Sequence, residues 1–294
     1  MAMTYLVWGL LGLCMAAILY EPVFAIVGRA FSDPEGRLRA IATVTVIGGL
    51  ASTAFLPGTS ALVTSLGWRS TVVVLAIVIG MTSVIVAQIA FRDQRWSAQT
   101  IRDALTGTAG ADGSDAPLDG ITRLTVVFAL SIVVNSAVVS NLVAALIDRG
   151  LAPTFTATVG ALLGIMQLPG RLLLSNAQTA PHPVKLLAGS FALQIVALLA
   201  LTVHGTVAMW CGVSAFAAGA GLTTLARPYL VLHQYGPARA GHANGVIARG
   251  QQVARAGPVA AAALGATQGY EVVFVGSGAT LLVALLLIVK RRSQ

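Results

Sequence analysis

Nine stretches of this chain are apolar and long enough to cross a lipid bilayer. A helix rises 1.5 Å per residue, so about 20 apolar residues span the roughly 30 Å hydrocarbon core of a membrane. Strands of a membrane barrel would be shorter and would alternate apolar and polar residues, so the pattern predicts helices. The chain is therefore expected to be an all-α integral membrane protein. The nine stretches are Thr4–Gly28, Leu38–Val63, Ser70–Phe91, Arg123–Ile147, Pro153–Leu174, Val184–Val203, Val207–His233, Gly241–Ala266 and Tyr270–Val289.

The overall composition agrees with a membrane protein. Hydrophobic residues make up 56% of the chain and charged residues only 10%, and the mean hydropathy is +0.85. A soluble domain of this length needs far more charge to cover its surface. The lipid bilayer is therefore the expected surrounding of most side chains.

The net charge of +8 has two interpretations, nucleic-acid binding or the sorting of charge across a membrane. The basic residues gather in alternate loops, around Arg37, Arg92, Arg239 and the last basic run at 290–292, whereas the opposite loops hold only Arg69 and Arg149. This alternation favours charge sorting and predicts no nucleic-acid partner. The long central loop and the C-terminus are expected in the cytoplasm, and the protein in the inner or plasma membrane.

A weak internal repeat links two parts of the chain. Members of one large transporter class are built from parallel repeats of membrane helices. Here the second copy follows the first by about 200 residues. Spans four to six have no counterpart that far upstream, so we expect a full-length or ancestral form with three more N-terminal helices. The paired positions are Arg37 with Arg239, Pro57 with Pro258, Gly67 with Gly269, and Trp68 with Tyr270.

Three motifs resemble those of the major facilitator superfamily of secondary transporters. The first, at 37–69, reads RLRAIATVTVIGGLASTAFLPGTSALVTSLGWR and is similar to the family's loop 4–5, helix 5 and the start of helix 6. The second, at 160–173, reads GALLGIMQLPGRLL and is similar to the end of helix 8. The third, at 225–265, contains ARPYLVLHQYG and ANGVIARGQQVARAGPVAAAALG and is similar to helices 10 and 11. The chain thus resembles helices four to twelve of the family's twelve.

The resemblance implies a division of the chain and a function. Residues 1–91 would form three helices of the first bundle, residues 92–122 a cytoplasmic linker, and residues 123–294 a complete six-helix second bundle. A small-molecule substrate would move by alternating access, driven by a coupling proton or other ion. The second-half signature around Gly164–Arg171 lacks its acidic residue, and Gln167 stands near that place. Symport and antiport therefore both remain open.

Two charged residues inside predicted spans are candidate binding groups, because a charge at membrane depth is costly and is usually retained for function. Glu21 lies past the middle of the first span and is a candidate proton-coupling carboxylate; a structural ion pair is the alternative. Arg255 lies near the middle of the eighth span and suits an anionic group of a substrate. An inter-helix or gating contact is its alternative.

Polar residues on two spans complete the candidate set. Asn244, Gln251 and Arg255 lie within about 40° on one helical stripe, and Gln252 flanks it. Family helix 7 lines the central cavity, so the resemblance favours Asn135 or Asn141 as a substrate contact. These two asparagines lie about 240° apart on a helix, so they are not both expected to face one cavity. Hydrogen bonding between helices is the alternative for each.

Other function classes lack their motifs. The histidines share no helical spacing that would suit a metal, and no phosphate-binding glycine loop or hydrolase motif is present, so no cofactor is expected and an enzyme is disfavoured. Transport remains the leading expectation. Two alternatives are a truncated, transport-inactive fragment and a permease subunit of another transport system. Because the first bundle would lack three helices, we expect the chain alone to transport poorly.

Overall fold

The computed structural model describes residues 2–18, 23–24, 27, 33–92, 118–152, 155–169, 181–254 and 257–289. Within these ranges the regular structure is helical and no strand occurs, which confirms the predicted all-α fold class. The helices are α1 (Ala2–Ile18), α3 (Pro34–Arg92), α5 (Ile121–Asp148), α6 (Thr156–Ile165), α8 (Pro183–Ala200), α9 (Thr206–Ala254), α10 (Gly257–Gln268) and α11 (Tyr270–Val289).

Each of the nine predicted spans contains helix. Among the described residues, five helical segments are long and apolar enough to cross a membrane by themselves. The predicted span at 153–174 holds the short α6, and the span at 241–266 is divided between the end of α9 and α10. The five segments are Gly58–Ile89, Ile121–Asp148, Pro183–Ala200, Thr206–Gly236 and Tyr270–Val289.

At three places in the described residues, a glycine with positive φ is the break at which one helix follows another directly. Gly67 (φ 76°, ψ 164°) divides α3, and Gly236 (φ 70°, ψ 170°) divides α9. Gly269 (φ 84°) separates α10 from α11. Glycine adopts positive φ without a steric penalty, so it suits such breaks. Gly67 and Gly269 are also partners in the sequence repeat, and the backbone therefore breaks at equivalent places in both copies.

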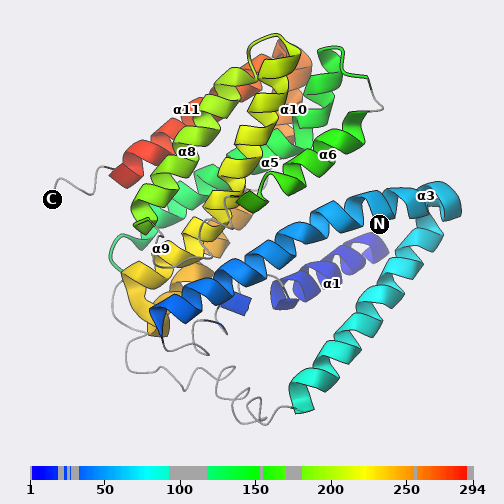
Figure 1. Ribbon diagram of the computed structural model, residues 1–294, viewed down its shortest axis with the longest axis vertical. Helices are drawn as coiled ribbons and strands as arrows, with labels where there is room; N and C mark the ends of the chain where they lie inside the picture. The colour runs from blue at the N-terminus through cyan, green and yellow to red at the C-terminus, as the bar shows by residue number, and fades with distance from the viewer. Residues whose placement is uncertain are drawn as a thin grey trace. The chain divides into compact units, whose positions relative to one another are not determined.

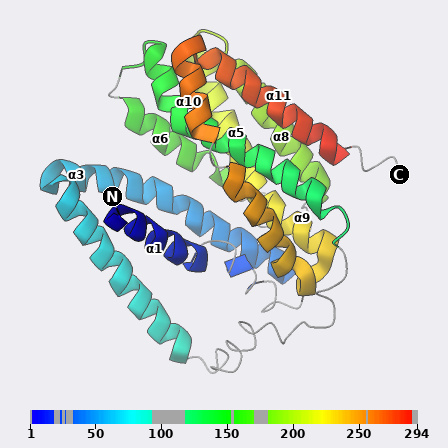
Figure 2. The ribbon, with the colours of Figure 1, turned by 180° about the vertical axis from the view of Figure 1, so that it is seen from behind.

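The chain forms two compact units. One comprises Met1–Ala51 with Pro117–Gln294, and the other comprises Ser52–Ala116. In the first unit, α5, α8, α9, α10 and α11 pack as a bundle and α6 packs against α9 (Figures 1 and 2). Four fully buried phenylalanines from four helices form the centre of this bundle: Phe128, Phe191, Phe216 and Phe274.

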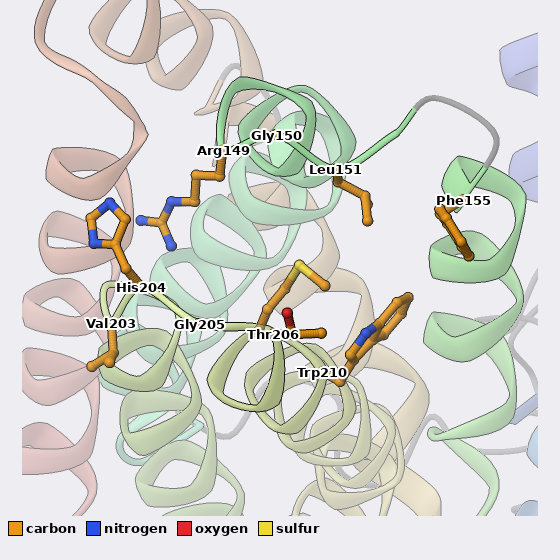
Figure 3. Close-up of a pocket in the computed structure, with 10 residues that line it drawn as sticks. Arg149, Gly150, Leu151, Phe155, Val203, His204, Gly205, Thr206 and Trp210 are labelled. Atoms are coloured by element: carbon orange, nitrogen blue, oxygen red, sulfur yellow. The ribbon is translucent and has the colours of Figure 1, made fainter.

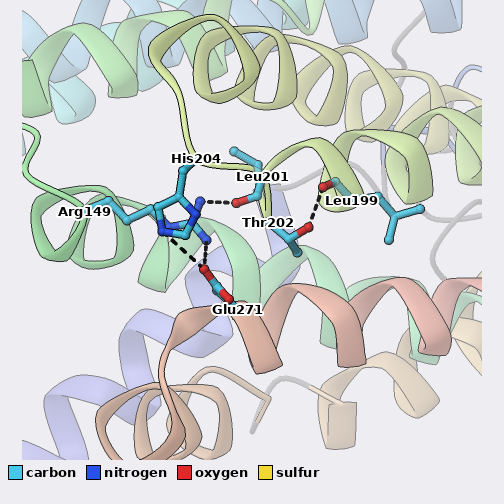
Figure 4. A network of polar contacts seen from close by, with 6 residues as sticks. All are labelled: Arg149, Leu199, Leu201, Thr202, His204 and Glu271. Carbon is cyan, nitrogen blue, oxygen red and sulfur yellow. Dashed lines mark hydrogen bonds and ion pairs between the residues drawn. The ribbon is translucent and has the colours of Figure 1, made fainter.

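One end of the bundle is defined by a polar cluster around Arg149. The guanidinium Nη2 of Arg149 lies 3.4 Å from Oε1 of Glu271, and Nε2 of His204 lies 3.7 Å from the same oxygen (Figure 4). Nη1 of Arg149 donates to the carbonyl of Leu201. The end of α5, the α8–α9 connection and the start of α11 therefore meet at one end, which we call the Arg149 end.

The opposite end is defined by contacts at the start of α5 and α8. Tyr235 Oη donates to the carbonyl of Asp119 at 2.9 Å. The rings of His182 and His233 meet edge to face with their centroids 4.9 Å apart. We call this end of the bundle the His182 end. Because α5 and α8 run from the His182 end to the Arg149 end and the first part of α9 returns, successive helices are antiparallel, as short connections between membrane helices require.

Helices α8 and α9 are held together by buried polar groups and by a close approach. Thr223 Oγ1 lies 3.0 Å from Ser190 Oγ and accepts from Gln194 Nε2 at 3.0 Å. A Cβ placed on Gly219 would lie 2.6 Å from Cγ of Gln194 and 3.0 Å from the carbonyl oxygen of Ser190. Small residues allow this approach, which strengthens dispersion contacts and interhelical hydrogen bonds in lipid.

Candidate functional site

Arg227 places a guanidinium inside the bundle. It lies on α9 within the candidate span Thr206–Gly236 and is half-buried. Nη1 of Arg227 donates to Oε1 of Gln251 at 2.7 Å, and Nη2 donates to the carbonyl of Asn244 at 3.2 Å. The two helical parts of α9, before and after Gly236, are therefore joined through one arginine.

Gln251 extends this contact to a third helical segment. Its Nε2 donates to the carbonyl of Phe128 on α5 at 3.3 Å. We call Arg227, Asn244, Gln251 and the Phe128 carbonyl the Arg227 cluster. Arg227 contacts the side chain of Gln251 and the backbone carbonyl of Asn244, so the common face expected for these two side chains stays a prediction. Whether Gln251 binds a substrate stays a prediction.

The two candidate asparagines of α5 have different surroundings. Asn141 is buried, and its Nδ2 donates to the carbonyls of Ala137 at 2.8 Å and Pro258 at 3.3 Å. This bond to Pro258 joins α5 to α10. Asn135 is half-buried, and within the described part of the chain its amide makes no hydrogen bond. Asn135 is therefore the asparagine with an amide available for a ligand.

Of the three remaining candidates, one lies within the described part of the chain. Gln252 is exposed on α9. Glu21 and Arg255 lie outside the described residues. Across the described ranges, no group of three or more His, Cys, Asp or Glu side chains is arranged to hold a metal ion. The amide groups of the Arg227 cluster can hydrogen-bond a small polar solute.

A separate cavity of about 420 Å³ opens at the Arg149 end (Figure 3). Sequence reasoning did not identify it, because its walls come from the residues that follow α5, from Phe155 just before α6, from the α8–α9 connection and from the start of α9. One signal was present: Arg149 is one of only two basic residues in the loops expected to be poor in positive charge. The lining residues are Arg149, Gly150, Leu151, Phe155, Val203, His204, Gly205, Thr206, Met209 and Trp210.

The fold and these polar contacts define a class. Apolar helices of membrane-spanning length pack in antiparallel order, and polar side chains such as Asn141, Gln194 and Gln251 bond between helices. The protein is a multi-pass α-helical membrane protein.

Comparison with known proteins identifies the family. Residues 1–256 match the Major Facilitator Superfamily. The chain belongs to the Major Facilitator Superfamily, which confirms the family inferred from its motifs. No curated protein matches the sequence.

Solved structures share the fold, and one of them is that of a transporter. The human organic anion transporter MFSD10 (TETRAN) is similar with a TM-score of 0.65 and 18% sequence identity. The match covers 90% of this chain and 66% of the MFSD10 chain. The chain therefore spans just under two thirds of the length of that relative, and at this identity the likeness concerns the fold alone.

Proposed function

We propose that this protein acts in the transmembrane transport of a small solute as a secondary transporter. The observation that carries the proposal is the family match over residues 1–256, supported by the antiparallel bundle with polar side chains at its helix contacts. In such transporters a solute site near the middle of the membrane becomes accessible from each side in turn as helix bundles rock. The solute leaves chemically unchanged, so we propose no enzymatic activity.

The proposed solute contacts lie in the second bundle. Asn135 offers an amide without a partner in the described ranges, and Gln251 places an amide beside Arg227. Gln252 and Asn141 are further proposed contacts, the former next to Gln251 on α9 and the latter on α5. The sequence adds Arg255 as a contact and Glu21 as a candidate for proton coupling. Hydrogen bonds from amides fix the orientation of a polar solute, and a nearby guanidinium favours an anionic group.

Anionic solutes are the first class to test. Arg255 lies near the middle of a predicted span, and MFSD10, which shares the fold, is described as an organic anion transporter. A charge at membrane depth is costly and is usually retained for function. We therefore propose a small organic anion as the solute, with a proton or other ion as a coupling partner.

The proposed orientation follows the charge pattern. Lys185 and Arg239 lie near the His182 end, so that end is placed in the cytoplasm by the positive-inside rule. The Arg149 end then faces the outside of the inner or plasma membrane. A cysteine introduced at Lys185 should be labelled by a membrane-impermeant maleimide only after the membrane is opened, and one introduced at Gly205 should be labelled in intact cells.

The experiment combines binding with uptake. A panel of small organic anions is first screened for an increase in the melting temperature of the purified protein, because binding to the folded state raises its stability. Solutes that bind are then tested for uptake into liposomes with and without the protein, and the recovered solute is checked by mass spectrometry. Saturable uptake of unchanged solute supports the proposal.

The same experiment separates the alternatives. Uptake equal to that of protein-free liposomes, for every solute that binds, contradicts transport by this chain and favours the transport-inactive fragment. Uptake that appears only when an ATP-hydrolysing partner is supplied favours a permease subunit. Chemical conversion of the solute contradicts the transporter proposal and favours an enzyme.

A further inference from the structure

The cavity at the Arg149 end has the size of a small-molecule site. Its volume of about 420 Å³ lies in the range of roughly 300–1,000 Å³ found for ligand pockets. It is built by connections that are held in place at one end of the bundle by Arg149, Glu271 and Leu201. The cavity is distinct from the Arg227 cluster, since its residues lie at the end of α5 and the start of α9.

One wall of the cavity carries a guanidinium that is already fixed in position. The Arg149 side chain is only 15% exposed. Its charge lies 5.6 Å from the centre of the Phe274 ring, and its two terminal nitrogens contact the Leu201 carbonyl and Glu271. Arginine has five N–H donors, so these contacts leave donors for a further acceptor. A ligand carboxylate would meet a cation that loses little side-chain entropy on binding.

The groups beside Arg149 favour an acceptor with negative charge. His204 lies next to Arg149 in Figure 3 and is 80% exposed. Glu271 contacts both of them but lies outside the cavity lining, as does the exposed Asp148. The bond between Glu271 and Arg149 is long, at 3.4 Å, and half of the Glu271 side chain is exposed. The ionisable side chains of the lining are therefore a cation and a histidine.

The facing wall is apolar and aromatic. Trp210 and Met209 are half-buried at the start of α9, and Leu151 is half-buried in the α5–α6 connection. Phe155 completes this wall with 49% of its surface exposed. Figure 3 shows Trp210 and Phe155 on the side of the cavity away from His204. Flat aromatic ligands gain stacking and burial against such side chains.

We propose that this cavity binds a small aromatic carboxylate, with the carboxylate on Arg149 and the ring against Trp210. The cation and the aromatic wall are both parts of one cavity, and a ligand with one charge and one ring satisfies both. The site needs no transport step in order to bind. Failure of binding and failure of the proposed transport are therefore separate results.

The test is equilibrium dialysis of the purified chain in detergent with 2-naphthoate, and with 2-naphthamide as the matched neutral probe. We expect saturable binding of 2-naphthoate and about tenfold weaker binding of the amide, since a hydrogen bond to a charged group contributes roughly one such factor. Equal binding of both probes, or no saturable binding of 2-naphthoate, overturns the proposal.

Variants test separately the wall that contacts the carboxylate and the wall that contacts the ring. Arg149→Gln should abolish the preference for carboxylate over amide, and Arg149→Lys should keep part of it. Trp210→Ala should weaken the binding of both probes about tenfold, the loss expected for a large aromatic contact. Arg69→Gln is the matched control, because Arg69, like Arg149, lies over an aromatic ring, 5.1 Å from the centre of the Trp68 ring, but lines no part of the cavity. Unchanged selectivity in a folded Arg149→Gln protein, or an equal loss in Arg69→Gln, contradicts the site.

Discussion

Arg227 Nη1 donates to Gln251 Oε1 at 2.7 Å, and this bond connects the two helices that meet at Gly236. Gln251 uses its other amide atom to reach the Phe128 carbonyl, at 3.3 Å. A single amide thus joins a charged side chain on one helix to the backbone of another. Bonds of this kind hold helices in register in lipid, where dispersion and hydrogen bonding replace the hydrophobic effect.

The first prediction concerns this bond. Gln251→Ala removes an acceptor from Arg227 and should lower the stability of the purified protein by about 1.5–3 kcal/mol, the usual contribution of a hydrogen bond to a charged group. Gln251→Glu should retain the acceptor and therefore lose less stability than Gln251→Ala. Thermal unfolding in detergent measures both. The control is the neighbouring substitution Gln252→Ala. Because Gln252 is exposed, the stability of this variant should stay within about 0.5 kcal/mol of that of the parent protein. Equal stabilities of the Gln251→Ala and Gln252→Ala proteins would contradict the structural role of Gln251.

A second prediction concerns the hydroxyl shared by α8 and α9. Thr223→Val removes an acceptor from Gln194 and the partner of Ser190, both of which are buried. The expected loss is about 0.6–1.7 kcal/mol, the range measured for hydrogen bonds between membrane helices. Thr267→Val is the control, because the Thr267 hydroxyl bonds only to carbonyls of its own helix. A comparable loss in both variants would show that the interhelical bonds contribute nothing.

A third prediction tests the close approach at Gly219. Gly219→Ala places a Cβ 2.6 Å from Gln194 Cγ and 3.0 Å from the Ser190 carbonyl, so α8 and α9 must separate. The expected destabilisation is about 1–3 kcal/mol, as for overpacking in a close-packed interior. Gly245→Ala is the control on the same element, since its added Cβ meets no atom within 4 Å. That variant should be neutral or slightly more stable, because alanine favours helix over glycine.

Much of the fold follows from local sequence. The spans are predicted by the length and hydropathy of each apolar stretch, and the breaks at Gly67 and Gly269 coincide with the internal repeat. Both features depend on residues near one another in the chain. The common face expected for Asn244 and Gln251 also rests on helical spacing alone.

The contacts between helices did not follow from the sequence. The pattern predicts that Gln251 lies on a polar stripe, but its bond to Arg227 depends on how the two parts of α9 fold back at Gly236. The cavity at the Arg149 end could be predicted even less from the sequence. Arg149, His204 and Trp210 come from loop ends separated along the chain, and no periodicity relates them. Their proximity is a result of helix lengths and packing.

The last prediction separates the two asparagines of α5. Asn141→Ala removes the bonds to the Ala137 and Pro258 carbonyls and should lower stability by about 0.6–1.7 kcal/mol, without a specific effect on a bound solute. Asn135→Ala removes an amide that has no partner in the described ranges and should leave the melting temperature unchanged.

If Asn135 contacts the transported solute, the Asn135→Ala variant should weaken solute binding about fivefold to tenfold, the effect of one lost hydrogen bond of about 1–1.5 kcal/mol. Thermal unfolding with and without the bound solute measures both quantities in each variant. A loss of stability in Asn135→Ala with unchanged solute binding would instead assign Asn135 to helix packing and leave Gln251, Gln252 and Arg255 as the remaining candidates in the second bundle.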